Sequence, residues 1–146
     1  MNSTAEIIVT QALLEDIMDM EGKYAPGDHT SLACIPEDTQ GKAHLICKAD
    51  GILAGVELAR LICREVDRGI RFLPLLADGS RIKKGDIAFE VYGEVKSLLR
   101  AERVVLNLMQ RMSGIATHTA PFVEAVKGTN ARITDTRKTT PALSYF

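Results

Sequence analysis

A long apolar stripe in the second half of the chain constrains the fold more than any other feature. Apolar side chains recur at helical spacing, at Leu98, Ala101, Val105, Leu108, Met109 and Met112. Charged and amide side chains occupy the opposite side, so the segment has one apolar face and one polar face. The pattern predicts a long amphipathic helix that packs on a core. We expect Ser113-Gly114 and Pro121 to weaken or kink its continuation, and Gly128 to cap its end.

The residues before this stripe alternate between helical and strand patterns. A first helix is expected to begin at Ser3 or Thr4 and to end near Gly22, and another to span residues 56–66. Strands are predicted over residues 42–48, 70–76 and 87–95, and Pro74 favours a sheet edge for the middle one. This order predicts a compact α+β domain over residues 1–96. Residues 97–146 then form linker helices and the entry to a second unit.

A short segment near the end of the chain carries the residues best suited to hold a ligand. Residues 131–135 predict a strand, and Thr136, Arg137 and Lys138 follow it directly. Arginine offers a planar fork for a carboxylate, and lysine offers a compact charge. Together with the threonine hydroxyl they can hold a small dianion, although a solvated loop with two surface cations is the alternative. Arg103, taken by itself, is typical of an exposed helical face with local ion pairs.

Composition excludes several functional classes. The net charge is -1, so no overall basic field attracts nucleic acid or anionic lipid. No apolar run reaches the ~18 residues of a membrane span, and the N-terminus lacks the basic region of a secretory signal. The three cysteines are odd in number and show no CxxC spacing, which is typical of reduced thiols in the cytoplasm. The histidines are isolated from one another, so the sequence contains no metal motif.

Three stretches carry a family resemblance. Residues 101–110 read AERVVLNLMQ, residues 112–117 read MSGIAT, and residues 135–141 read DTRKTTP. They resemble the quinolinate phosphoribosyltransferases, also called carboxylating nicotinate-nucleotide pyrophosphorylases. The spacing of Gly27-Asp28, residues 51–55 and Gly85-Asp86 agrees with that family as well. The resemblance therefore covers nearly the whole chain.

The resemblance implies both a fold and a reaction. The fold is an α+β N-terminal domain, a sandwich-like arrangement of helices and a mixed or antiparallel sheet, followed by a long helix and the first strand of an α/β barrel. The reaction transfers a phosphoribosyl group from phosphoribosyl pyrophosphate to quinolinate with decarboxylation, giving nicotinate mononucleotide for NAD biosynthesis. Mg²⁺ is expected to accompany the pyrophosphate, on ligands that this chain does not contain.

The resemblance also assigns roles to individual residues. It implies that Thr136, Arg137 and Lys138 lie at the end of the first barrel strand and contact quinolinate, with Lys138 as the catalytic residue. It implies that Arg103 reaches the same substrate from the partner chain of a homodimer or higher homo-oligomer. No residue of the chain is assigned to a metal, and nucleic acid and membrane are not expected partners.

The chain departs from the family in one respect, its length. An α/β barrel needs about 200 residues or more, and one barrel strand is predicted here. We therefore expect a truncated chain that lacks the complete active site and is inactive alone. A related pyrophosphorylase-like protein with another acceptor is one alternative. A non-catalytic module is another, either an oligomerising fragment or a lipoyl-like domain suggested by the turns of residues 78–90, although no hairpin tip with a modifiable lysine occurs.

Overall fold

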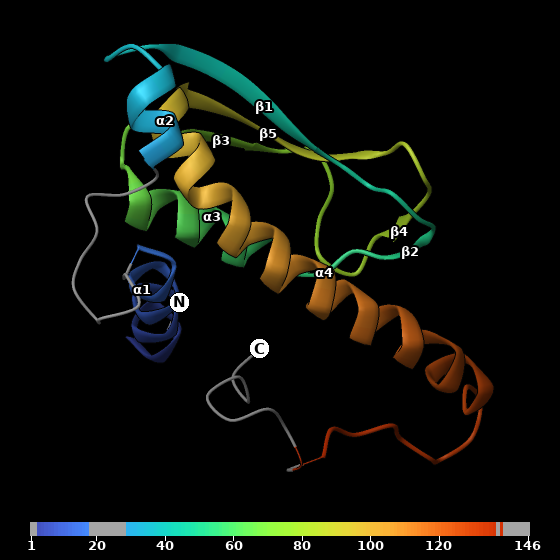
Figure 1. The fold of residues 1–146 in the computed structure, drawn as a ribbon. Helices are drawn as coiled ribbons and strands as arrows, with labels where there is room; N and C mark the ends of the chain where they lie inside the picture. Colours follow the sequence, from blue (N-terminus) through green and yellow to red (C-terminus); the bar gives the residue numbers. More distant parts are fainter. Residues whose placement is uncertain (1–2, 18–28, 137, 139–146) are drawn as a thin grey trace.

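The computed structural model describes residues 3–17, 29–136 and 138. This part of the chain forms helices and short antiparallel strands (Figure 1). The helices are α1 Ser3–Ile17, α2 His29–Cys34, α3 Val56–Val66 and α4 Val95–Ala125. The strands are β1 Gln40–Ile46, β2 Gly51–Ile52, β3 Arg71–Pro74, β4 Arg81–Ile82 and β5 Ile87–Glu94.

Two small antiparallel sheets organise the strands. The larger sheet has the order β1-β5-β3, so β5 is its central strand, and β2 pairs with β4 in a separate ribbon. Val91 of β5 lies opposite Ala43 of β1 and Phe72 of β3. The expectation that Pro74 belongs to an edge strand is confirmed, since β3 has one neighbour and a missing N–H is tolerated there.

A polar cluster lies across β1 and β5. Lys42 Nζ lies 2.6 Å from Glu90 Oε1, and the Tyr92 hydroxyl donates a hydrogen bond to Glu90 Oε2, also at 2.6 Å. These bonds hold the pKa of Glu90 below its usual range, with the hydrogen bond from Lys42 as the largest cause. The same bond raises the pKa of Lys42.

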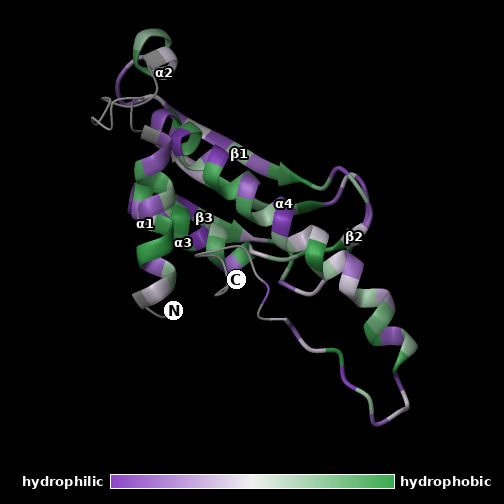
Figure 2. Ribbon diagram, turned by 60° about the horizontal axis from the view of Figure 1, so that its bottom comes forward, coloured by the Kyte–Doolittle hydropathy of each residue, from purple (hydrophilic) through white to green (hydrophobic). Residues whose placement is uncertain are grey.

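The core lies between one face of the larger sheet and the helices α3 and α4, with α1 packed against these two helices. α4 contacts α3, β1 and β5, and α1 lies against both α3 and α4. Figure 2 shows hydrophobic and hydrophilic residues alternating along α4, as its amphipathic spacing requires. Ile62, Val9 and Val56 are the largest fully buried side chains. Burying a side chain of this size contributes about 1.5–3 kcal/mol to stability.

The predicted amphipathic helices are confirmed. Helix α3 spans the predicted residues 56–66, and α4 buries Ala101, Val105 and Met109 of the apolar stripe. The expected weakening at Ser113-Gly114 and Pro121 is wrong, because α4 runs unbroken to Ala125 with the proline inside it, and the alternative of a kink stays a prediction. The predicted end of the first helix near Gly22 lies outside the described residues.

The final strand predicted over residues 131–135 is wrong. These residues have no regular secondary structure, and all of them are exposed. A strand requires a neighbour that pairs with its N–H and C=O groups, and within the described residues no segment pairs with this one. A β-branched run alone does not supply that partner. The start of a barrel is therefore absent from the described structure.

The predicted domain boundary near residue 96 stays a prediction. Helix α4 begins at Val95, and its first half contributes Ala101, Val104, Val105 and Met109 to the core of the α+β unit. Its second half extends away from that core (Figure 1). None of the helices in the described ranges combines the length and the apolar character needed to cross a membrane.

Candidate substrate-binding site

Two hydroxyl groups fix α4 on β2 and on the segment that joins β2 to α3. Thr117 Oγ1 accepts a hydrogen bond from the Ile52 N–H at 2.8 Å. Ser113 Oγ accepts one from the Ala54 N–H at 3.0 Å and donates one to the Ala54 carbonyl at 3.1 Å. The two hydroxyls are four residues apart, so they lie on one face of the helix and reach one stretch of backbone.

Glycines permit the helix to approach this closely. A Cβ at Gly51 would lie 2.5 Å from Thr117 Oγ1, and a Cβ at Gly55 would lie 3.1 Å from Met109 Cγ. Gly55 also has a φ of +103°, a conformation that other residues rarely adopt. Residues 51–55 and 112–117, both of which carry the family resemblance, thus have a structural role. Sequence reasoning missed it, although the glycine pair and the hydroxyl pair, each spaced by four residues, were the visible signal.

Arg103 lies in the first half of α4 with its side chain largely in solvent. Its exposed fraction is 71%, and its Nη1 donates a hydrogen bond to Oδ1 of Asp16 at 2.8 Å. Asp16 belongs to α1, so the bond joins two helices that are far apart in the sequence. An exposed pair of this kind contributes little to stability, roughly 0–1 kcal/mol. The guanidinium is therefore accessible and held at one corner.

Thr136 and Lys138 lie in the exposed chain beyond α4. The backbone N–H of Lys138 donates a hydrogen bond to Thr136 Oγ1 at 3.3 Å. A threonine side chain that bonds the backbone two residues ahead forms a short turn. Both side chains are exposed, and Arg137 between them lies outside the described residues.

The described structure does not join the two parts of the predicted site. In the described ranges, no hydrogen bond or ion pair connects Arg103 with Thr136 or Lys138. The same ranges contain no group of three or more His, Cys, Asp or Glu side chains that could hold a metal ion. The substrate-binding roles of these residues, and the Mg²⁺, stay predictions.

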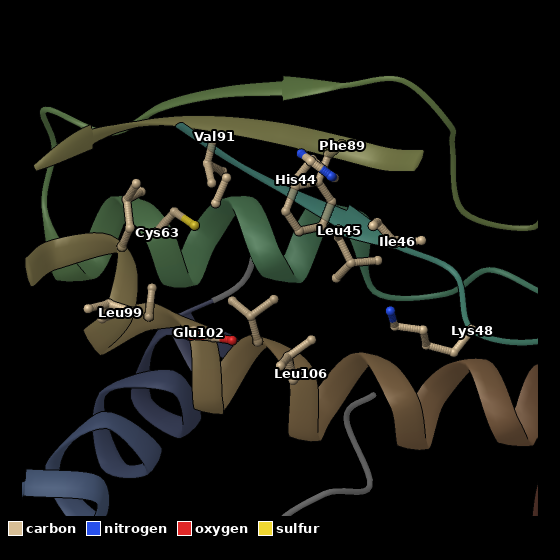
Figure 3. Close-up of a pocket in the computed structure, with 14 residues that line it drawn as sticks. His44, Leu45, Ile46, Lys48, Cys63, Phe89, Val91, Leu99, Glu102 and Leu106 are labelled. Atoms are coloured by element: carbon tan, nitrogen blue, oxygen red, sulfur yellow. The ribbon is translucent and has the colours of Figure 1, made fainter. Parts of the chain in front are cut away.

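A pocket of about 300 Å³ lies between β1, β5 and α4 (Figure 3). Its walls are mostly apolar and include Leu45, Phe89 and Leu106, whereas Lys48 lies at one end. Burial raises the pKa of the Cys63 thiol in the wall to about 11, so this thiol is neutral and weakly nucleophilic. A site for a dianion needs converging cations or N–H donors. This pocket does not have that composition.

The α+β unit with its long helix has the architecture of the nicotinate-nucleotide pyrophosphorylases. The structure resembles the enzyme from Francisella tularensis with a TM-score of 0.84 at 32% identity, over 97% of this chain and 48% of that one. It resembles NadC from Streptococcus pyogenes with a TM-score of 0.82 at 36% identity, over 93% of this chain and 47% of that one. The expected α+β class is thereby confirmed, and the barrel is not.

Sequence comparison defines the family. The family model for the N-terminal domain of quinolinate phosphoribosyl transferase matches residues 28–113, and the model for its C-terminal domain matches residues 115–146. The chain belongs to the quinolinate phosphoribosyl transferase family, as its motifs predicted.

Curated relatives agree with this assignment. The decarboxylating quinolinate phosphoribosyltransferase 1b of Nicotiana tabacum is 43% identical over 136 residues, which cover 93% of this chain and 37% of the relative. The carboxylating nicotinate-nucleotide pyrophosphorylase of Mycobacterium leprae is 42% identical over 118 residues, covering 80% of this chain and 42% of the relative. The chain thus spans less than half the length of the relatives that it matches.

Proposed function

We propose that this chain forms part of an enzyme that transfers a phosphoribosyl group from phosphoribosyl pyrophosphate to quinolinate with decarboxylation, for NAD biosynthesis. One observation carries the proposal. The two family models match the chain in sequence order, one across Arg103 and the other across Thr136, Arg137 and Lys138. The relatives' own names state the substrate and the decarboxylation.

The residue types suit a substrate with two carboxylates. Arg103 and Arg137 each offer N–H groups spaced to bind a carboxylate through two parallel hydrogen bonds. Lys138 offers a point charge that can lie against the reacting ring, and the Thr136 hydroxyl can donate one further hydrogen bond. The Arg103 guanidinium, at 71% exposure, is accessible to such a ligand.

The proposed reaction joins two steps. The pyridine nitrogen of quinolinate forms a bond to the anomeric carbon of the ribose, while the bond from that carbon to the pyrophosphate oxygen breaks. The bond from the ring to the adjacent carboxylate then breaks and releases carbon dioxide, and a proton replaces it on the ring carbon. We assign Lys138 to this second step, because its ammonium can stabilise the electron pair that develops on the ring carbon.

The pyrophosphate leaving group calls for a divalent cation. When present, Mg²⁺ would supply positive charge to stabilise the pyrophosphate as a leaving group. The described residues contain no cluster of ligands for it. We propose that its ligands belong to the part of the relatives' length that this chain does not cover, and that the 146-residue chain shows no transferase activity by itself.

The same proposal includes a homodimer in which Arg103 enters the partner's site. Leu99 and Leu106 flank Arg103 at intervals of four and three residues, so all three lie along one side of α4. The two leucines are 39% and 44% exposed, which is high for large apolar side chains on a folded unit. Exposed apolar side chains around an arginine are typical of protein interfaces.

We place the enzyme in the cytoplasm as part of this proposal. All three cysteines, Cys34, Cys47 and Cys63, are free thiols, which suits a reducing compartment. Relatives in Oryza sativa and Nicotiana tabacum are named as chloroplastic and mitochondrial proteins, so cell fractionation is the direct check.

A comparison of acceptors tests the proposed function. The full product of the gene that encodes this chain is supplied with phosphoribosyl pyrophosphate, Mg²⁺ and either quinolinate or nicotinate, and pyrophosphate release is measured. Nicotinate lacks one carboxylate, so we expect its kcat/KM to be lower by about 100-fold or more, because a site built for that group is left with unpaired charges. Equal use of both acceptors, or use of neither, would overturn the assignment to quinolinate.

A further inference from the structure

Asp16 has no cationic partner in its own turn of α1. It lies in the last described turn of this helix, and that turn contains no basic residue. What the carboxylate does gain is a partner on another helix, the Arg103 guanidinium of α4.

The two partners differ in how far they are exposed to solvent. The Asp16 side chain is 20% exposed, whereas the Arg103 side chain is 71% exposed. The carboxylate is thus held within the packing of α1, and the guanidinium extends from it into solvent. The hydrogen bond of 2.8 Å therefore anchors the exposed Arg103 side chain on the less exposed Asp16 carboxylate.

The bond leaves the binding edge of the guanidinium open. It uses Nη1, and in the described part of the chain Asp16 is the one hydrogen-bond partner of Arg103. The edge formed by Nε and Nη2, which can bind a carboxylate through two parallel hydrogen bonds, therefore faces no protein acceptor among these residues. A single contact at the opposite corner orients that edge without covering it.

We propose that Asp16 is a positioning residue that orients Arg103 to bind a carboxylate of the substrate. This inference rests on the proposed function, because it requires Arg103 to contact quinolinate. An arginine side chain samples many rotamers in solution, and ordering it lowers binding affinity. Asp16 orders the guanidinium before the substrate arrives, so binding of the substrate loses less side-chain entropy.

The alternative is that Asp16 merely ties α1 to the rest of the unit. The chain offers a matched control for this reading, because Glu6, also in α1, forms an ion pair with Arg64 of α3 at 3.2 Å. Glu6→Gln removes a tether of the same kind and leaves Arg103 untouched. Asp16→Asn removes the charge of Asp16 with almost no change in volume, and Asp16→Glu retains it.

The test is steady-state kinetics on the full gene product with both substrates varied. We expect Asp16→Asn to raise KM for quinolinate about three- to fivefold, the most that an exposed ion pair can supply, with kcat and KM for phosphoribosyl pyrophosphate changed less than about twofold. Asp16→Glu should recover part of the loss, and Glu6→Gln should match the wild type. In an Arg103→Ala background, Asp16→Asn should have no further effect.

The inference and the proposed function would fail with different experimental results. If Asp16→Asn and Glu6→Gln change KM equally, or if Asp16→Asn still acts in the Arg103→Ala background, then Asp16 has a structural role and the inference is overturned. If the wild-type protein shows no turnover of quinolinate, the proposed function fails and the inference fails with it. The ¹⁵N-resolved side-chain signal of Arg103 in the 146-residue chain provides an independent readout. Its Nη1–H groups, one of which donates to Asp16, should exchange faster with water in Asp16→Asn than in Glu6→Gln, and equal rates would count against an ordered guanidinium.

Discussion

Replacing Ser113 with alanine should destabilise the folded chain by about 1.5 kcal/mol. Ser113 Oγ forms two part-buried hydrogen bonds with the backbone of Ala54, at 3.0 and 3.1 Å. Each bond of this kind contributes about 1 kcal/mol net, so about 2 kcal/mol is lost with the hydroxyl. Alanine favours a helix over serine by about 0.5 kcal/mol, which offsets part of that loss. The remainder corresponds to a fall in melting temperature of about 3–6 °C for a chain of this size.

Urea unfolding followed by circular dichroism measures this change. The midpoint should fall and the m-value should stay the same, since the surface exposed on unfolding does not change. Thr119→Ala is the matched control, because the Thr119 hydroxyl donates to the Ile115 carbonyl within α4 and reaches no other element. Its removal should leave stability unchanged or slightly raised. If Ser113→Ala and Thr119→Ala agree within about 0.5 kcal/mol, the docking role of Ser113 is refuted.

Three further predictions concern the site, the thiols and the dependence of stability on acid pH. Mixing Arg103→Ala and Lys138→Ala protomers of the full gene product should restore about one quarter of wild-type activity, since half of the random dimers contain one intact site; no recovery would contradict a site shared between protomers. A thiol reagent at about pH 8 should label the exposed Cys34 much faster than the two buried thiols, whose pKa values are raised by burial, and equal rates in the native chain would contradict that burial. Glu90→Gln should make the loss of stability at acid pH less steep. The bond from Lys42 lowers the pKa of Glu90. The stability that this carboxylate contributes is therefore present above the usual glutamate pKa and disappears as the pH falls through the lowered value. Urea unfolding across that pH range measures this effect. If the stability of Glu90→Gln falls with acid pH as steeply as that of the wild type, the Lys42–Glu90–Tyr92 cluster contributes nothing to stability.

Periodic features of the sequence predicted the helices well. The α3 pattern repeats its apolar residues without interruption, and the structure begins and ends the helix at the predicted residues, Val56 and Val66. Proline at position 74 excluded a central strand, and β3 lies at a sheet edge. Both inferences depend on the local chain alone, which explains their success.

Features that depend on distant partners were not predictable in the same way. Residues 131–135 have the composition of a strand, but nothing in the described structure pairs with them. Gly114 and Pro121 disfavour a helix locally, yet α4 continues through both, and the hydroxyl contacts of Ser113 and Thr117 hold this part of the helix against the β2–α3 segment. Tertiary contacts thus support the helix around Gly114, whereas residues 131–135 lack the pairing partner that a strand needs.

The motifs named the residues of the candidate site, whose roles stay a prediction, and they gave no information on its geometry. The motifs around Arg103 and Lys138 identified the family, because they are long and specific. The ion pair between Arg103 and Asp16 crosses 87 residues of sequence, and no periodicity or spacing indicates it. The arrangement of Arg103 relative to Thr136 and Lys138 is set by neither motif, and the described structure leaves them unconnected.

Release of labelled carbon dioxide from quinolinate tests the central claim most directly. The assay uses the full gene product with and without phosphoribosyl pyrophosphate, and compares Lys138→Ala with Lys127→Ala. Lys127 is the control, because its side chain is 74% exposed and pairs with Glu124 on the surface. We predict release that requires phosphoribosyl pyrophosphate, persists in Lys127→Ala and falls by about 100-fold or more in Lys138→Ala. Release that is absent from the wild type, or that is unchanged in Lys138→Ala, would contradict the account.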